Sequence, residues 1–147
     1  RSISNDETTQ HVLAEEGILY TLDMTHDDQP TPVNTRAGRL VSIPYSLEVN
    51  DVPLFVSRNT PAERYVAICK AQFDQLYAEG ADSGTVMCMP LHPYLIGQPH
   101  RVAALDAVLA HITSHDQVWL ATGRELAQHY IDHHLAAHKT WIAEGTP

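Results

Sequence analysis

The chain has few positively charged residues and no long apolar run. Its 147 residues include nine Lys and Arg against 18 Asp and Glu, which gives a formal net charge of −9. Phosphate backbones and anionic lipid surfaces attract basic proteins, so we expect neither nucleic acid nor a membrane as a partner. A membrane-spanning helix needs about 20 consecutive apolar residues, and no stretch of the sequence approaches that length. We therefore expect a compact, soluble domain.

Cysteine is scarce as well, since Cys69 and Cys88 are the only two. Both fall in segments predicted as a helix and a buried strand, where reduced thiols behave as small hydrophobic groups. A reducing cytoplasm is therefore favoured, although an even count also permits one disulfide. The sequence contains no Gly-rich phosphate loop, no nucleophile elbow around a serine and no paired-cysteine metal motif. It begins at Arg1 without a signal-peptide pattern, and we expect a fragment of a longer protein.

Helix and strand signals alternate along the chain. Helices are predicted from N-cap residues, glycine stops and apolar residues spaced three and four apart, and strands from short β-favouring apolar runs. Helices are predicted over residues 5–16, 102–112 and 124 to about 142. A further helix is capped by Asn59 or Thr60, has Pro61 in its first turn and ends at Gly80. The predicted strands are 18–22, 39–45, 85–89 and 118–121. This alternation predicts an α/β fold with parallel strands in a single domain, 1–147.

Three polar segments follow predicted strands and are candidates for a site. They are 27–30, within the long loop 23–38, then 45–51 and 91–93. In parallel α/β sheets and barrels, chemistry gathers in the loops at the carboxyl ends of strands. We therefore expect the three segments to open onto one face.

His92 is the sharpest candidate in these loops. It directly follows an apolar run and lies between Pro90 and Pro93, which restrict the backbone on either side. An imidazole with an ordinary pKa of about 6.5 can give a proton to a departing amine near neutral pH and recover it. The alternative is a histidine that only bonds to the backbone at a strand end.

Acidic side chains in the same loops have two possible roles. Asp27, Asp28, Glu48 and Asp51 can ligate a hard cation or orient a histidine. Turn chemistry explains each of them more simply, because Asp favours loops in which it bonds to its own backbone. Glu48 and Asn50 are two residues apart, and an extended segment would place both on one side.

The last predicted helix carries four histidines, His129, His133, His134 and His138. Two pairs are four residues apart and share a helix face, a spacing that can bind zinc. No third ligand is evident nearby, so a solvated helix end is the favoured interpretation and no metal ligand is assigned within the chain.

Three segments together carry a family resemblance. RLVSIPYSLEVNDVP, LHPYLIGQPHR and DQVWLATGRELAQHY resemble the C-terminal half of the polysaccharide deacetylase (NodB-homology) superfamily, especially its intracellular, allantoinase-like branch. The order and spacing of THDDQPTPVNTRAG and ILYTLDM fit the same branch. The resemblance implies the C-terminal part of a distorted (β/α) barrel that hydrolyses amide-type C–N bonds, either of an N-acetylated sugar or of a cyclic ureide or imide.

The resemblance also implies roles for individual residues. His92 matches the late histidine that protonates the leaving nitrogen, and Arg1 matches an arginine that orients the catalytic base. Candidate substrate-binding residues are Asp28, Tyr45, Glu48 and Asn50. The family's base aspartate and its metal-binding histidines belong to earlier motifs that this sequence lacks. A divalent metal, usually zinc, would therefore require the missing N-terminal half.

Three functions remain open at this stage. The first is an enzyme half that acts on a small-molecule or carbohydrate amide once the N-terminal half completes it. The second is a non-catalytic barrel half, whose exposed strand edges would drive pairing with that half or homo-oligomerisation. The third is metal storage or sensing through the C-terminal histidines.

Overall fold

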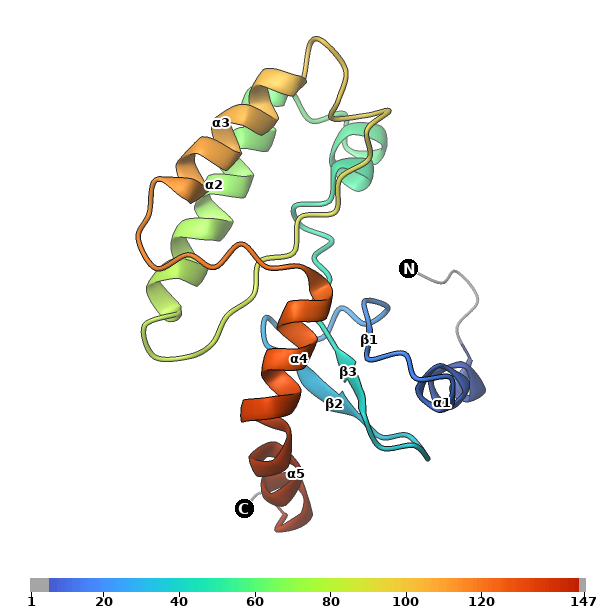
Figure 1. Cartoon of the computed structure of the whole chain (residues 1–147). Coiled ribbons are helices and arrows are strands. Elements are labelled where there is room, and N and C mark those ends of the chain that lie inside the picture. The colour runs from blue at the N-terminus through green and yellow to red at the C-terminus, as the bar shows by residue number, and fades with distance from the viewer. Residues whose placement is uncertain (1–5, 146–147) are drawn as a thin grey trace. The chain divides into compact units, whose positions relative to one another are not determined.

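The structure, a computed structural model, describes residues 6–145, so Arg1 lies outside the described residues. The described chain forms two compact units. Of the described residues, 6–44 and 120–145 make one, called here the sheet unit, and Tyr45–Trp119 make the other, called the hairpin unit. The mixed α/β class predicted from the sequence is confirmed (Figure 1). The single domain stays a prediction.

The sheet unit contains three short strands. They are β1 (Tyr20–Thr21), β2 (Thr31–Val33) and β3 (Leu40–Ser42), in the order β1-β3-β2. β1 and β3 pair in parallel, as the alternation predicts, and β2 pairs with β3 in antiparallel fashion. All three residues of β3 are buried, which fits its central place in the sheet.

Three helices complete the sheet unit: α1 (Glu7–Glu15), α4 (Gly123–His133) and α5 (Leu135–Ala143). Capping boxes begin two of them. The Asp6 side chain accepts from the backbone of α1, and the Thr122 side chain accepts from that of α4, so each satisfies backbone N–H groups that have no partner within the helix. α1 contacts β3, α4 contacts β1 and α5 contacts β2.

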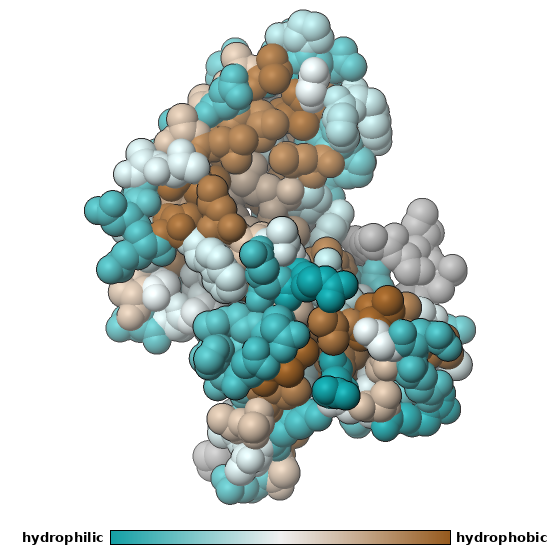
Figure 2. Space-filling view, in the orientation of Figure 1, coloured by the Kyte–Doolittle hydropathy of each residue, from teal (hydrophilic) through white to brown (hydrophobic). Residues whose placement is uncertain are grey.

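The hairpin unit is built on two long helices that pack against each other, α2 (Ala62–Glu79) and α3 (Val102–Thr113) (Figure 1). A π-helical turn, η1 (Val52–Ser57), precedes α2. The buried core joins all three elements and includes Leu54, Phe55, Tyr65, Cys69, Phe73, Val108 and Ile112. Figure 2 also shows an apolar area on the visible face of this unit.

Several predicted elements differ from the structure. Segments 85–89 and 118–121 belong to no helix or strand in the structure, and among residues 6–145 the only strands are β1, β2 and β3. β2 lies within the predicted loop 23–38, and Pro32 is tolerated there because β2 is an edge strand. That the chain forms the C-terminal part of a distorted (β/α) barrel stays a prediction, since the described residues contain three strands.

Helix boundaries also differ in two places. Pro61 itself occupies the N-cap position of α2, where its extended backbone conformation (ψ 152°) marks the last residue before the helix. The predicted helix 124–142 breaks at His134, whose φ and ψ of −125° and −30° separate α4 from α5. Within residues 6–145, no helix is both long and apolar enough to cross a membrane.

Candidate active site

Asp51 and His92 form a hydrogen-bonded pair in the hairpin unit. The Asp51 side chain is fully buried, whereas 36% of the His92 side chain is exposed. The His92 ring donates from Nδ1 to Asp51 Oδ1 over 2.6 Å, and the His92 backbone N–H donates to Oδ2 over 2.7 Å. One carboxylate therefore fixes both the backbone and the ring of this histidine.

The backbone around the pair is held on both sides. The Asp51 N–H donates to the carbonyl of Pro90 at 3.4 Å, and Pro90 is buried. The His92 carbonyl accepts from the backbone N–H groups of Leu95 and Ile96 at 2.8 and 3.1 Å, and Ile96 is in the buried core. His92 therefore begins a turn that is anchored in the core, so its ring is preorganised.

This geometry defines the state of the imidazole. A carboxylate can only accept, so Nδ1 carries a proton and Nε2 is the nitrogen left to face a ligand. A buried carboxylate on Nδ1 also stabilises the positively charged ring that forms when Nε2 takes up a proton. The pair has the chemistry of a general acid and the group that orients it.

Tyr45 and Asn50 are brought together beside Asp51. The Asn50 side chain donates from Nδ2 to the Tyr45 hydroxyl at 3.0 Å and accepts from the Val52 backbone N–H at 2.9 Å. Asn50 is 5% exposed, and its amide bridges Tyr45 to the first turn of η1. A substrate-binding role for either residue stays a prediction.

Glu48 and Asp28 have local partners. Glu48 Oε2 accepts from the Ser46 hydroxyl at 3.1 Å and from the Leu47 backbone N–H at 3.0 Å. The segment turns here instead of running extended, so Glu48 is exposed while Asn50 is buried, and the expectation that they share one side is wrong. Asp28 belongs to the sheet unit, where its backbone N–H donates to Asp27 Oδ1 at 2.7 Å. Their roles toward a substrate stay predictions.

In the sequence, Asp51 is only one of several loop acids. Asp51 and His92 are 41 positions apart, so no local spacing in the sequence predicts that they form a pair. A carboxylate in a loop can orient a histidine, and this is the only property in the sequence that points to Asp51. The same property applies equally to Asp27, Asp28 and Glu48, so it does not identify Asp51.

The two cysteines have no activated thiol. Burial raises the pKa of Cys69 to about 11 and also raises the pKa of Cys88 above its ordinary value. Both are free in the structure, as expected for reduced thiols. Nucleophilic chemistry at either cysteine is therefore disfavoured, because the thiolate is the reactive form.

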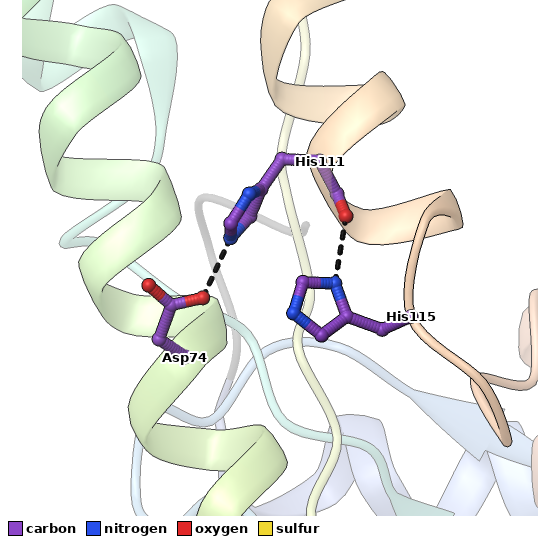
Figure 3. A group of neighbouring side chains, drawn as sticks. All are labelled: Asp74, His111 and His115. Carbon is purple, nitrogen blue, oxygen red and sulfur yellow. Dashed lines mark hydrogen bonds and ion pairs between the residues drawn. The ribbon is translucent and has the colours of Figure 1, made fainter.

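One group of three side chains in the described part of the chain can hold a metal ion, and it does not include His92. Asp74, His111 and His115 place one ligand atom each within 4.8 Å of one another (Figure 3). Around His92, Nδ1 is already bonded to Asp51. The metal centre that the family resemblance implies is therefore not assembled at His92 by the described residues.

Comparison with known proteins supports a relationship along most of the chain. No family model matches. A Schizosaccharomyces pombe protein named "Putative polysaccharide deacetylase" is 32% identical over 120 residues, which cover 74% of this chain and 38% of that protein. The chain thus spans well under half of this relative's length.

Solved structures give the same result. The crystal structure of Puue allantoinase has a TM-score of 0.81 and 34% identity, covering 89% of this chain and 45% of its own. That of a probable polysaccharide deacetylase from Pseudomonas aeruginosa has a TM-score of 0.79 and 35% identity, with coverage of 88% and 44%. A putative polysaccharide deacetylase from Mycobacterium smegmatis gives 0.76 and 26%, with coverage of 92% and 47%. The chain belongs to the polysaccharide deacetylase superfamily and spans less than half the length of each of these relatives.

Proposed function

We propose that the protein containing this chain hydrolyses the amide C–N bond of an N-acetylated sugar, with His92 as general acid. The observation that carries the proposal is the pairing of a partly exposed imidazole with a fully buried carboxylate 2.6 Å away. Two further findings support it, because the relatives in three organisms bear the name polysaccharide deacetylase and the structural matches cover most of this chain.

The proposed reaction is the addition of water to the amide carbonyl followed by collapse of the tetrahedral intermediate. As the C–N bond breaks, the nitrogen takes a proton from His92 Nε2 and departs as an amine, leaving a carboxylic acid. Asp51 keeps Nδ1 protonated and aims Nε2 outward, and its negative charge favours the imidazolium that must form before each transfer. Asp51 is thus a positioning residue.

Other parts of the reaction require residues beyond this chain. We propose that the catalytic base, and the ligands of any zinc that polarises the carbonyl, come from a segment that precedes it. Arg1 would orient that base. Tyr45, Asn50 and Glu48 would lie around the substrate opening, where polar side chains can hold the hydroxyl and acetyl groups of a sugar. Asp28, in the sheet unit, is a further candidate for substrate binding.

The apolar run 86–89 supports the proposal that another strand covers part of this chain. Val86, Met87, Cys88 and Met89 are all only half-buried, although they form the apolar run that the sequence predicts as a buried strand. We propose that this run pairs with a neighbouring strand from the preceding segment, or from a second copy, to form a (β/α) barrel. The two free cysteines fit a cytoplasmic location.

The test compares the full-length protein with His92→Ala and a control, His100→Ala, on N-acetylglucosamine oligomers. His100 is exposed in the loop before α3, so its removal should leave turnover unchanged. Loss of a general acid should lower kcat by about 10²–10⁴-fold. Wild-type turnover by His92→Ala on every amide that the protein cleaves would rule out the assignment.

The similarity to Puue allantoinase favours a second candidate, ring opening of a cyclic ureide. The same acid would then protonate a ring nitrogen as its C–N bond breaks. Side-by-side assays on allantoin and on N-acetylated sugar oligomers distinguish the two substrates. If neither is cleaved and this chain self-associates in light scattering, a non-catalytic assembly module becomes the better account, whereas a well-behaved monomer would argue against both the fragment and the pairing.

A further inference from the structure

Asp74, His111 and His115 converge between α2 and α3, away from the Asp51–His92 pair in sequence (Figure 3). Asp74 lies on α2, His111 in the last turn of α3, and His115 just beyond the end of that helix. We propose that these three side chains form a zinc-binding site. The proposal is independent of the proposed hydrolysis, because it uses none of the same residues.

The orientation of His115 is the first argument. Its Nδ1 donates to the backbone carbonyl of His111 at 2.8 Å, which fixes the proton on Nδ1 and leaves a lone pair on Nε2. In Figure 3 the second ring nitrogen points toward the Asp74 side. Zinc-binding histidines characteristically donate their other ring nitrogen to a carbonyl or carboxylate in this way, which fixes the ring and raises its basicity.

Aromatic neighbours hold both imidazoles in place. The Phe73 ring packs edge-on against His111 and His115, with centroids 5.6 and 4.9 Å away. Tyr77 contacts His115 at 5.0 Å, and its hydroxyl donates to the Asp116 carbonyl at 3.1 Å, which ties the segment after α3 to α2. The two rings therefore lose little freedom when a ligand binds, which favours binding.

The contact between Asp74 and His111 marks where the ion would lie. His111 Nε2 donates to Asp74 Oδ1 over 2.6 Å, because a carboxylate can only accept. To bind zinc, Nε2 must give up this proton while Nδ1 carries one, which leaves the Nε2 lone pair and the Asp74 carboxylate for the ion. Since Zn–N and Zn–O bonds are about 2.0–2.2 Å long, the two atoms must separate to roughly 3.3 Å in a tetrahedral site. The Asp74 side chain is 55% exposed, so it has room to rotate.

The donor set selects the class of metal. Two imidazoles and one carboxylate suit zinc, whereas magnesium and calcium prefer oxygen ligands alone. Three protein ligands leave a fourth position for water or another ligand. An ion held this way would also link α2 to α3, since each helix supplies at least one ligand.

The simpler alternative is an ion pair between Asp74 and His111 that holds the helices together. It accounts for those two residues but leaves unexplained why a third donor lies within 4.8 Å with its nitrogen available. The C-terminal histidines are the competing metal site in this chain. His129 and His133 have ring centroids 4.6 Å apart, but no third ligand groups with them among residues 6–145.

The test measures zinc binding to the full chain by competition with a chromophoric chelator, together with the visible absorption of the cobalt-substituted chain. Variants are Asp74→Ala and His115→Ala, with the double variant His129→Ala/His133→Ala as the matched control. We expect one equivalent of zinc, a tenfold or greater loss of affinity in each site variant, and no change in the control. Tetrahedral cobalt should give intense bands that His115→Ala abolishes.

Folding of each variant is checked by circular dichroism, and Asp74→Asn and His115→Gln replace any alanine variant that unfolds. Zinc should also raise the Tm of the wild-type chain but not that of His115→Ala. Unchanged affinity in both site variants, or affinity lost in the control, would overturn the proposal. His92→Ala should bind zinc like the wild type, so failure of one proposal leaves the other standing.

Discussion

Replacing Asp51 by Asn tests the arrangement at His92 most directly. The buried carboxylate accepts two N–H groups of His92, at 2.6 and 2.7 Å. An amide keeps one acceptor oxygen, but its NH₂ group cannot accept the second N–H. The ring must therefore lose its proton from Nδ1 and carry it on Nε2, or turn away.

The expected cost follows from the loss of a hydrogen bond to a buried charge. Such bonds contribute about 1.5–3 kcal/mol, so the free energy of unfolding of Asp51→Asn should fall by about that amount. The matched control is Asp82→Asn, because Asp82 is exposed in the turn after α2 and its change should stay within about 0.5 kcal/mol.

Two measurements check this prediction. Urea unfolding of the isolated chain gives the free-energy difference, and long-range ¹H–¹⁵N NMR correlations of the His92 ring report its tautomer. The wild-type ring should be protonated at Nδ1, and that of the variant at Nε2. Equal stability of Asp51→Asn and Asp82→Asn, with the same tautomer as the wild type, would refute the reasoning.

Three further predictions concern the packing, the thiols and one helix cap. Leu54 is 1% exposed, so Leu54→Ala should lower the free energy of unfolding measured in urea by about 2–5 kcal/mol. Val56 in the same turn is 63% exposed, so Val56→Ala should leave that free energy nearly unchanged. Equal effects of the two substitutions would contradict the assignment of Leu54 to the core. Cys69, with a pKa of about 11, should resist iodoacetamide at pH 8 until urea unfolds the chain, and fast labelling of the native chain would be the contrary result. Hydrogen bonds from Thr122 hold the pKa of Glu125 below its ordinary value, so the ionised Glu125 stabilises α4 above the ordinary pKa, and this stabilisation is lost as the pH falls through the lowered pKa. Circular dichroism between pH 6 and 3 should therefore show a loss of helix in the wild-type chain that is absent in Glu125→Gln. Identical pH profiles of the two proteins would argue against the cap.

Local signals in the sequence were sufficient for most helices. Acidic capping at Asp6 and apolar residues spaced along α2 and α3 identify these helices, because caps and helix faces depend on residues three and four positions apart. The break at His134 has no such signal. It coincides with a hydrogen bond between the Tyr130 hydroxyl and His138 Nδ1 at 2.6 Å, which joins the two helices across the break.

Strands were harder, because a ladder depends on a partner far along the chain. The sequence gives 85–89 and 118–121 the composition of strands, yet within the described residues neither has a partner strand. β2 shows the reverse case, since Thr31–Val33 lies in a proline-rich segment and pairs because β3 offers an edge. The candidate site follows the same rule: the loop position and flanking prolines of His92 are local, but its bond to Asp51 is not.

Gly123 shows how one absent side chain can set the packing of the sheet unit. It is the first residue of α4, and a Cβ built there would lie 2.7–2.8 Å from two ring carbons and the hydroxyl oxygen of Tyr20 in β1. Those contacts are shorter than real Cβ atoms tolerate, so Gly123→Ala must displace Tyr20 or α4. We expect a loss of about 1–3 kcal/mol, the usual cost of overpacking.

The matched control is Gly84→Ala, because a Cβ at Gly84 meets nothing within 4 Å. Restricting the unfolded chain should make that variant neutral or slightly more stable, by up to about 1 kcal/mol. If the ring causes the clash, adding Tyr20→Ala should relieve it, so the two substitutions should be non-additive by about 0.5–3 kcal/mol in urea unfolding. If the stability changes of the two substitutions are strictly additive, α4 does not pack against the Tyr20 side chain, and the close approach of helix and strand would need another cause.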